Sequence, residues 1–313
     1  MDGPTNPDAT DLAKPSVPGA ATGPTLRATC WGTRGSIPSP GPATARFGGN
    51  TSCLEIRTDD ERCHIFDAGT GIRVLGNRLG QEQGPTAADI FVTHFHWDHI
   101  QGIPFFAPLH AEDSRIRIHA ARQGDLDIET LLKTQMGPVY FPVPYEALAA
   151  ELSFEHLSGR PWHHDGTEVA AYRVRHAAHT YGYRIRAGSA AVAYIPDNEL
   201  VGSSYPVDGP DWYDGLVAFL DGVDVLFHDA MFTEEEYPDV EGWGHSTFEQ
   251  AVKLAEDAGV ARLYFFHHAP ERTDAELLGI LDTMREAVDR RGSDLALGVA
   301  AEGEELLVTG GES

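Results

Sequence analysis

The sequence has few cysteines and no long run of apolar residues. Cys30, Cys53 and Cys63 are an odd number and lack the short, regular spacing of a structural zinc site, so we expect buried thiols in a reducing compartment. No apolar segment approaches the roughly 18 residues that indicate a membrane-spanning helix, and the first residues lack the basic and apolar regions of a signal peptide. We therefore expect a cytoplasmic protein that has no membrane partner.

Basic residues are also scarce. There are 48 acidic and 23 basic residues, which gives a formal net charge of −25, and only three of the basic residues are lysine. Affinity for DNA or RNA comes largely from basic side chains that displace counterions from phosphates. The composition therefore disfavours long nucleic acid as a partner, although a local basic groove would be compatible with it. Solubility or a salt-rich cytoplasm would also explain the charge.

Apolar segments bounded by Gly, Asp, Asn or Pro predict many short strands. The predicted strands are 26–31, 53–58, 63–67, 89–93, 115–120, 168–175, 181–187, 190–195, 223–228, 262–266, 296–300 and 304–308. Helices are predicted at 126–135, 211–221, 246–258 and 274–290. The last two would begin with capping boxes, one from Ser246 to Glu249 and one from Thr273 to Glu276.

The order of these elements predicts an α/β fold. Many strands come first and then strands alternate with helices, which fits two sheets face to face with helices on both outer sides, a four-layer αββα sandwich. Residues 1–24 are rich in Pro, Gly, Thr, Ala and Asp, so we expect a disordered tail there. Residues 25–313 contain no repeat or linker and are expected to form a single domain.

Four side chains of the metal-ligand type lie within six residues, at His94, His96, Asp98 and His99. They follow the predicted strand 89–93 and so begin the loop at its carboxyl end. Alternation along an extended chain places the first three on one side and His99 elsewhere, which suits a division between two metal ions. The alternative is a histidine-rich loop without function, but three imidazoles and a carboxylate at this density have no evident packing role.

This run resembles the His-x-His-x-Asp-His signature of the metallo-β-lactamase superfamily. Further segments resemble the other motifs of that superfamily in the same order: Phe66 to Gly71, His176 to Arg184, Tyr194 to Asp197, and Phe266 to Pro270. The resemblance spans roughly residues 26–308, and it implies a metal-dependent hydrolase.

The resemblance also implies a role for each motif residue. It divides the ligands between two ions, with His94, His96 and His176 on one, and Asp98, His99 and His267 on the other. Asp197 and a water or hydroxide would bridge the ions, and Asp67 would support the metal loop. These ligands suit Zn²⁺ and also accept Mn²⁺ or Fe²⁺. Histidine at position 96, where redox di-iron relatives carry Glu, favours hydrolysis.

Two segments resemble the branch that includes ribonuclease Z and the cyclic-phosphate phosphodiesterases. They are His228-Asp229-Ala230 and Gly244-His245-Ser246-Thr247. The resemblance implies that Asp229, in place of the more usual Glu, orients His245, which would act as general acid or stabilise phosphoryl charge. Asp98 is a further catalytic candidate. The alternative for His245 is an exposed residue before a helix.

Two glycine-rich segments, 31–36 and 48–51, resemble the first loops of a sub-branch with a Trp-Gly-Thr-Arg-Gly-Ser opening. Such loops let backbone N–H groups approach an anion closely, so Arg34, Ser36 and Asn50 are candidate substrate-binding residues, and His179 is a fourth. We expect His268 to point away from the ligands. The histidines that match no motif are expected to be surface or hydrogen-bonded residues: His64, His110, His119, His156, His163 and His164.

Ribonuclease Z carries a long tRNA-gripping arm between the motifs of His176 and Asp197. Here these residues are only 21 positions apart, which leaves room for a hairpin and nothing else. The sequence therefore predicts a dinuclear metal phosphodiesterase whose substrate is a small anionic phosphodiester, such as a cyclic nucleotide or cyclic sugar phosphate, attacked by a metal-bridging hydroxide. We expect part of the pocket wall to come from residues 100–172.

Several alternatives stay open at this stage. They are a ribonuclease Z-like tRNA 3′-processing endonuclease, a lactone, thioester or β-lactam hydrolase, and a catalytically silent nucleotide- or metal-sensing module. A homodimer is common in the branch that the chain resembles, but the sequence does not decide the oligomeric state.

Overall fold

The computed structural model describes residues 25–82, 84–177, 179–202, 205, 207 and 209–310. The tail predicted for residues 1–24 lies outside this part of the chain. Within it the strands form two seven-stranded sheets.

The first sheet has the strand order β14-β1-β2-β3-β4-β5-β6. Its strands are β1 (Thr25–Gly32), β2 (Cys53–Thr58), β3 (Cys63–Phe66), β4 (Ala87–Phe91), β5 (Arg115–Ala120), β6 (Glu151–His156) and β14 (Glu305–Thr309). Pairing is antiparallel from β14 through β1 and β2 to β3, and parallel from β3 to β6.

The second sheet has the strand order β13-β12-β11-β10-β9-β8-β7. Its strands are β7 (Trp162–His164), β8 (Thr167–Arg173), β9 (Tyr181–Ala187), β10 (Ala190–Ile195), β11 (Val225–Asp229), β12 (Arg262–Phe266) and β13 (Ala296–Val299). The strands from β7 to β10 pair antiparallel, and those from β10 to β13 pair parallel.

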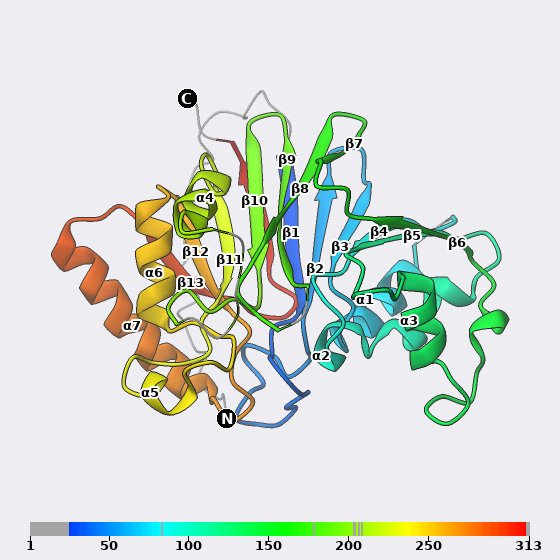
Figure 1. The fold of residues 1–313 in the computed structure, drawn as a ribbon, viewed down its shortest axis with the longest axis horizontal. Helices are drawn as coiled ribbons and strands as arrows, with labels where there is room; N and C mark the ends of the chain where they lie inside the picture. Colours follow the sequence, from blue (N-terminus) through cyan, green and yellow to red (C-terminus); the bar gives the residue numbers. More distant parts are fainter. Residues whose placement is uncertain are drawn as a thin grey trace, which may run out of the picture.

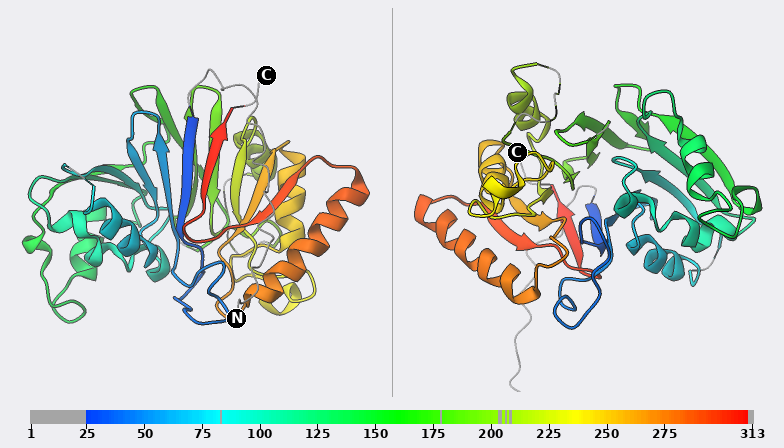
Figure 2. Two further views of the ribbon diagram at one scale, coloured as in Figure 1. Left: turned by 180° about the vertical axis from the view of Figure 1, so that it is seen from behind. Right: turned by 60° about the horizontal axis from the view of Figure 1, so that its bottom comes forward.

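Helices cover the outer face of each sheet (Figures 1 and 2). On the side of the first sheet lie α1 (Gly71–Leu79), α2 (Trp97–Ile100), α3 (Ile128–Gln135) and three 3₁₀ turns, η1 (Ile103–Phe105), η2 (Ala107–His110) and η3 (Tyr145–Ala147). On the side of the second sheet lie α4 (Trp212–Phe219), α5 (Tyr237–Val240), α6 (Phe248–Asp257) and α7 (Asp274–Arg291). No helix within the described residues is long and apolar enough to cross a bilayer.

Three apolar cores separate these four layers, and strand β10 shows why. It is buried along its whole length. Val192 and Tyr194 pack in the core between the two sheets, whereas Ala193 and Ile195 pack in the core under the helices of the second sheet, because successive side chains of a strand point to opposite faces. A third core lies between the first sheet and α1 and α3. The predicted αββα sandwich is therefore confirmed.

All twelve predicted strands and four predicted helices are present, with ends within two residues of the prediction. The structure adds β6, β7, α1 and α2, which were not predicted, together with the short α5. The capping box at Thr273 is confirmed. The one predicted at Ser246 is wrong by one position: Thr247 is the N-cap and Gln250 its partner, because the Ser246 hydroxyl donates to the carbonyl of Asn198 instead.

The strand directions bring several carboxyl ends to one end of the sandwich, the lower end in Figure 1. The strands β3 and β4 of the first sheet run parallel, as do β10, β11 and β12 of the second. Strand β8 also has the direction of β10, since both pair antiparallel with β9. Side chains that follow these strands must therefore meet at this end.

Candidate metal centre

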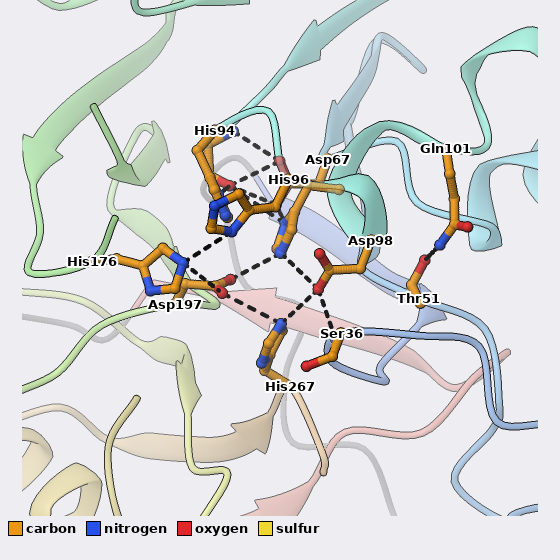
Figure 3. A network of polar contacts seen from close by, with 12 residues as sticks. Ser36, Thr51, Asp67, His94, His96, Asp98, Gln101, His176, Asp197 and His267 are labelled. Carbon is orange, nitrogen blue, oxygen red and sulfur yellow. Dashed lines mark hydrogen bonds and ion pairs between the residues drawn. The ribbon is translucent and has the colours of Figure 1, made fainter. Parts of the chain in front are cut away.

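Loops at the carboxyl ends of four strands supply the predicted ligands. His94 comes soon after β4 and His176 soon after β8, while Asp197 and His267 follow β10 and β12. The chain after β4 continues into the short helix α2, which turns Asp98 and His99 inwards so that both are buried. Figure 3 shows the labelled side chains of His94, Asp98, His176, Asp197 and His267 pointing toward one another.

The seven predicted ligands form overlapping groups in which the ligand atoms all lie within 4.8 Å of one another. These groups include His94 with His96 and His176; Asp98 with His99 and His267; and His94 with His99 and Asp197. The first two groups are the two sets that the sequence predicted, and Asp197 is shared with both sides. The residues thus come together from positions up to 173 apart in the chain.

Asp197 lies between the two groups. Its Oδ2 is 3.0 Å from Nε2 of His99, and its Oδ1 is 3.4 Å from Nε2 of His267 and 3.6 Å from Nε2 of His176. Asp98 Oδ2 is 3.1 Å from the same atom of His267. The position of Asp197 suits a carboxylate that contacts two cations at once.

His94 Nε2 is buried without a hydrogen-bond partner among the described residues, and so are His99 Nε2 and Asp197 Oδ2, which are 3.0 Å apart but make no hydrogen bond of normal geometry. A buried polar atom without a partner costs stability, and a cation among these atoms would satisfy all three. Burial and the neighbouring His99 hold the pKa of His94 well below its usual value, which favours the neutral imidazole that binds metals. The residues present therefore fit a group of bound cations.

Hydrogen bonds to the outer atoms fix the ligand rings. Asp67 is fully buried and its Oδ2 lies 2.7 Å from Nδ1 of His99. The same carboxylate accepts hydrogen bonds from the Thr93 backbone N–H and the Tyr194 hydroxyl. On the other side, Nδ1 of His176 lies 2.9 Å from the Gly244 carbonyl oxygen and donates to it. In each case Nε2 is left to face the centre, as in metal sites with supported histidines.

His245 and Asp229 form a buried pair next to the ligands. Nδ1 of His245 lies 2.8 Å from Oδ2 of Asp229, which ends β11, and the His245 ring stacks on that of His267 at 5.0 Å between centroids. Burial would lower the pKa of His245, but the Asp229 charge and hydrogen bond outweigh burial and raise it to about 9. His245 is only 9% exposed, so the alternative of an exposed histidine is wrong.

Arg34 and Asn50 are corrections to the sequence prediction. Arg34 has no exposed surface, and its guanidinium donates to the carbonyl oxygens of Gly48, Ala269 and Arg272. It joins two loops and has no access to a substrate. The Asn50 side chain donates to the Glu302 carboxylate, so it is engaged in the same loop packing.

Ser36 and His179 are placed differently. The Ser36 backbone N–H donates to Asp98 Oδ2 at 2.7 Å, with a left-handed φ of 63°, so Ser36 lies at the centre. His179 is exposed, and its backbone pairs with the side chain of Gln123. His179 belongs to none of the ligand groups found among the described residues.

Two of the remaining histidines test the prediction directly. His268 points away from the ligands, as predicted: it is buried and its Nε2 lies 3.0 Å from the Ala300 carbonyl oxygen. His64 is fully buried, but neither of its ring nitrogens has a partner among the described residues, so the prediction of a surface or hydrogen-bonded residue is wrong there. Burial lowers its pKa to about 4.

Two glycines at the centre were not predicted as site residues. A Cβ at Gly35 would lie 2.4 Å from Nδ1 of His267, and one at Gly244 would lie 2.3 Å from Nδ1 of His176. Both glycines therefore make room for a ligand ring. Gly35 belongs to the segment 31–36, for which the sequence predicts anion-binding backbone, and Gly244 belongs to the segment that carries His245. In neither case does the sequence indicate that the glycine leaves space for a histidine ring.

Comparisons with known proteins agree with this geometry. A family model described as Beta-lactamase superfamily domain matches residues 62–268. Ribonuclease Z of Haloferax volcanii is 26% identical over 90% of this chain and 95% of its own length. Among solved structures, the metallo-β-lactamase fold protein YhfI from Bacillus subtilis superposes with a TM-score of 0.63 at 20% identity, covering 91% of this chain and all of that one. A diphosphatase from the PhnP family also has a TM-score of 0.63 at 20% identity, over 90% and 97% of the two chains.

The family match covers most of the chain, and it includes the segment with four of the candidate ligands within six residues. The chain belongs to the metallo-β-lactamase superfamily. Within that superfamily it is similar to the branch that includes ribonuclease Z, and it is a metallo-hydrolase.

Proposed function

We propose that the chain is a dinuclear metal-dependent phosphodiesterase that hydrolyses a small phosphodiester, such as a cyclic nucleotide or cyclic sugar phosphate. The ligand set of imidazoles and carboxylates favours two Zn²⁺ ions, with Mn²⁺ or Fe²⁺ as substitutes. His94, His96 and His176 would hold one ion, and Asp98, His99 and His267 the other, with Asp197 shared between them. Divalent ions there would supply the nucleophile by lowering the pKa of a water molecule.

The chain's own residues would position and protonate the substrate. Asp67 keeps His99 oriented through its Nδ1, and the Gly244 carbonyl does the same for His176. We propose that Asp98 has both a ligand role and a catalytic role. The Ser36 backbone N–H donates to its Oδ2 and holds the carboxylate in place. Ser36 and His179 stay our candidates for substrate contact, because one borders Asp98 and the other lies three residues from His176.

The observation that carries the proposal is the Asp229–His245 pair beside the ligand cluster. With Nδ1 held by Asp229, His245 has Nε2 available to give a proton to a departing alkoxide oxygen, as a general acid does. Proton donation alone would also serve a lactone or a β-lactam, whose leaving oxygen or nitrogen needs a proton as well. The pair favours phosphodiester over carbonyl substrates because it resembles the carboxylate–histidine pair of the ribonuclease Z branch, to which the chain is similar.

A ribonuclease Z-like nuclease is the second candidate. It is favoured by the similarity to Haloferax volcanii ribonuclease Z along nearly the whole chain. Against it, the segment between His176 and Asp197 holds the hairpin of β9 and β10, where ribonuclease Z would insert its tRNA-binding arm. The net charge of −25 also opposes a long polyanion.

A substrate panel tests the proposal. The purified protein would be assayed for bound metal and then with bis(p-nitrophenyl) phosphate, 2′,3′- and 3′,5′-cyclic nucleotides, precursor tRNA, a lactone and a cephalosporin. We expect metal-dependent turnover of the small diesters. Carbonyl hydrolysis without diester hydrolysis would overturn the proposal, and cleavage of precursor tRNA alone would favour the second candidate.

A matched pair of variants tests the ligand assignment. His176→Ala should lose bound metal and activity together. His163→Ala changes a histidine whose side chain is 65% exposed on β7, and it should retain both. Equal metal content in the two variants would contradict the assignment of His176.

A further inference from the structure

Three of the large apolar side chains that stay exposed are neighbours of the candidate centre in the chain. Ile37 is 59% exposed, Trp97 59% and Trp243 63%. Single exposed apolar residues are normal on any protein, but these three adjoin site residues in the chain, and ligand sites are lined predominantly by hydrophobic and aromatic side chains. Their positions therefore bear on what the centre binds.

Each of these residues lies close to a group of the centre. Trp97 stands between His96 and Asp98, at the first position of α2. Trp243 precedes Gly244, whose carbonyl oxygen is 2.9 Å from Nδ1 of His176. Because consecutive Cα atoms are about 3.8 Å apart, the two tryptophans cannot lie far from the ligands.

The two tryptophans come from opposite halves of the sandwich. Trp97 belongs to the loop after β4 of the first sheet, and Trp243 belongs to the loop between α5 and α6 beside the second sheet. In Figure 1 the helices α2 and α5, which adjoin these loops, lie on either side of the lower end. Ile37 follows Ser36, whose N–H donates to Asp98, and adds a third side from the loop between β1 and β2. Exposed apolar residues therefore adjoin the centre in loops from both halves of the sandwich.

Three of the arginines near this end are already engaged. Arg34 is buried against carbonyl oxygens, and Arg272 pairs with the Glu236 carboxylate at 2.6 Å. The Arg175 guanidinium lies 4.3 Å from the centre of the Trp212 ring. These three guanidinium groups are held by other parts of the chain, whereas Trp97 and Trp243 are exposed, which suits a substrate with a single phosphate and a large apolar group.

We propose that Trp97 and Trp243 select phosphodiesters that carry a planar aromatic group, such as a nucleobase or an aryl ester, over sugar or alkyl phosphodiesters. This inference rests on the proposed phosphodiesterase function. It deepens that function because a cyclic nucleotide presents such a ring and a cyclic sugar phosphate does not. Stacking of a base on an aromatic side chain tolerates different bases, since every base has a π-face.

The test uses two cyclic diesters with the same leaving group, a 2′,3′-cyclic nucleotide and methyl ribofuranoside 2′,3′-cyclic phosphate, which has a methoxy group in place of the base. The metal-loaded wild type should prefer the cyclic nucleotide. Trp97→Ala and Trp243→Ala should each lower kcat/KM for the cyclic nucleotide by about tenfold, mainly through KM, and change it for the methyl riboside by less than about twofold, as expected when binding alone is removed. Trp97→Phe should restore the preference. Leu307→Ala, an exposed apolar residue on β14, is the matched control and should leave both rates unchanged.

The outcomes separate this inference from the proposed function. If the wild type is active but the tryptophan variants lose both diesters equally, or lose neither, the aromatic selection is wrong. If the wild type hydrolyses neither diester, the proposed function fails, and calorimetric binding of phenyl phosphate and methyl phosphate to the metal-loaded protein decides the inference. Tighter binding of phenyl phosphate that Trp243→Ala abolishes would support it, and equal binding would overturn it. Bound metal, measured in every variant, identifies any that no longer fold.

Discussion

Removal of the His245 ring is the most informative single change at the centre. His245→Ala deletes the imidazole that Asp229 holds through a 2.8 Å contact in a buried position. A positioned general acid contributes about 10²–10⁴-fold to rate. That contribution applies only when the leaving oxygen needs a proton, so the expected loss depends on the leaving group.

The assay compares two substrates. A 2′,3′-cyclic nucleotide releases an alkoxide that must be protonated, and we expect kcat to fall by about 10²–10³-fold in His245→Ala. Bis(p-nitrophenyl) phosphate releases a stable phenolate that needs no proton, and we expect a loss of less than about tenfold. Asp229→Asn keeps an acceptor for the Asn198 N–H but removes the charge, and it should show an intermediate and equally selective loss.

Bound metal and a control variant make this result interpretable. His245→Ala should keep its metal, because the predicted ligands are other residues, and His163→Ala should behave as wild type. Equal losses on both substrates would refute the role of His245 as general acid. Loss of metal from His245→Ala would instead show that it is itself a ligand.

Three further predictions concern the support of the centre and the core. Gly35→Ala should force the His267 ring to move, because the added Cβ would lie 2.4 Å from Nδ1; we expect about 10–100-fold weaker metal binding in a metal titration, and Gly41→Ala, with nothing within 4 Å among the described residues, should bind as wild type. Asp67→Asn removes the charge that orients His99 and should weaken metal binding by about 10–100-fold; unchanged affinity would mean that Asp67 serves packing alone. His64 has its pKa lowered by burial from 6.5 to about 4, so the unfolded chain binds a proton between these values and the folded chain does not, and stability falls as pH falls through this window. On acidification from about pH 7 to about pH 5, the free energy of unfolding measured in urea should fall by about 2 kcal/mol less in His64→Leu than in wild type. An equal fall in both proteins would contradict a buried neutral histidine.

The layered fold was predictable because most of its strands are buried on both faces or alternate clearly. The strand Ala190–Ile195 is apolar throughout, which identifies a central strand. The missed strand β6 is an edge strand with exposed Glu151 and Glu155. Its half-buried positions alternate with exposed ones, and the charged residues make this pattern of apolar and polar side chains difficult to recognise. The missed helix α1 contains Gly76, a poor helix former, which lets the helix approach the Phe106 ring closely. That contact is tertiary and leaves no local signal.

The residues of the metal centre could be predicted from the sequence, but the direction in which each neighbouring side chain points could not. His94 to His99 are recognisable from local spacing, and their assembly with Asp197 and His267 follows from strand direction. The error at Arg34 has a different origin. Its guanidinium is bound by carbonyl oxygens of residues 48, 269 and 272, two of which are more than 200 positions away, and nothing in the motif indicates which way the side chain turns.

The two sheets contribute almost equal numbers of ligands to the centre, and this division affects the stability of the folded protein. His94 to His99 extend from the first sheet, whereas His176, Asp197 and His267 extend from the second. The three cysteines all lie in β1, β2 and β3 of the first sheet, so no disulfide can join the halves. Bound ions would link the two halves through their ligands. Because the ions bind only the folded state, they would stabilise it by mass action. Metal supply would then govern how long the protein persists as well as how fast it works.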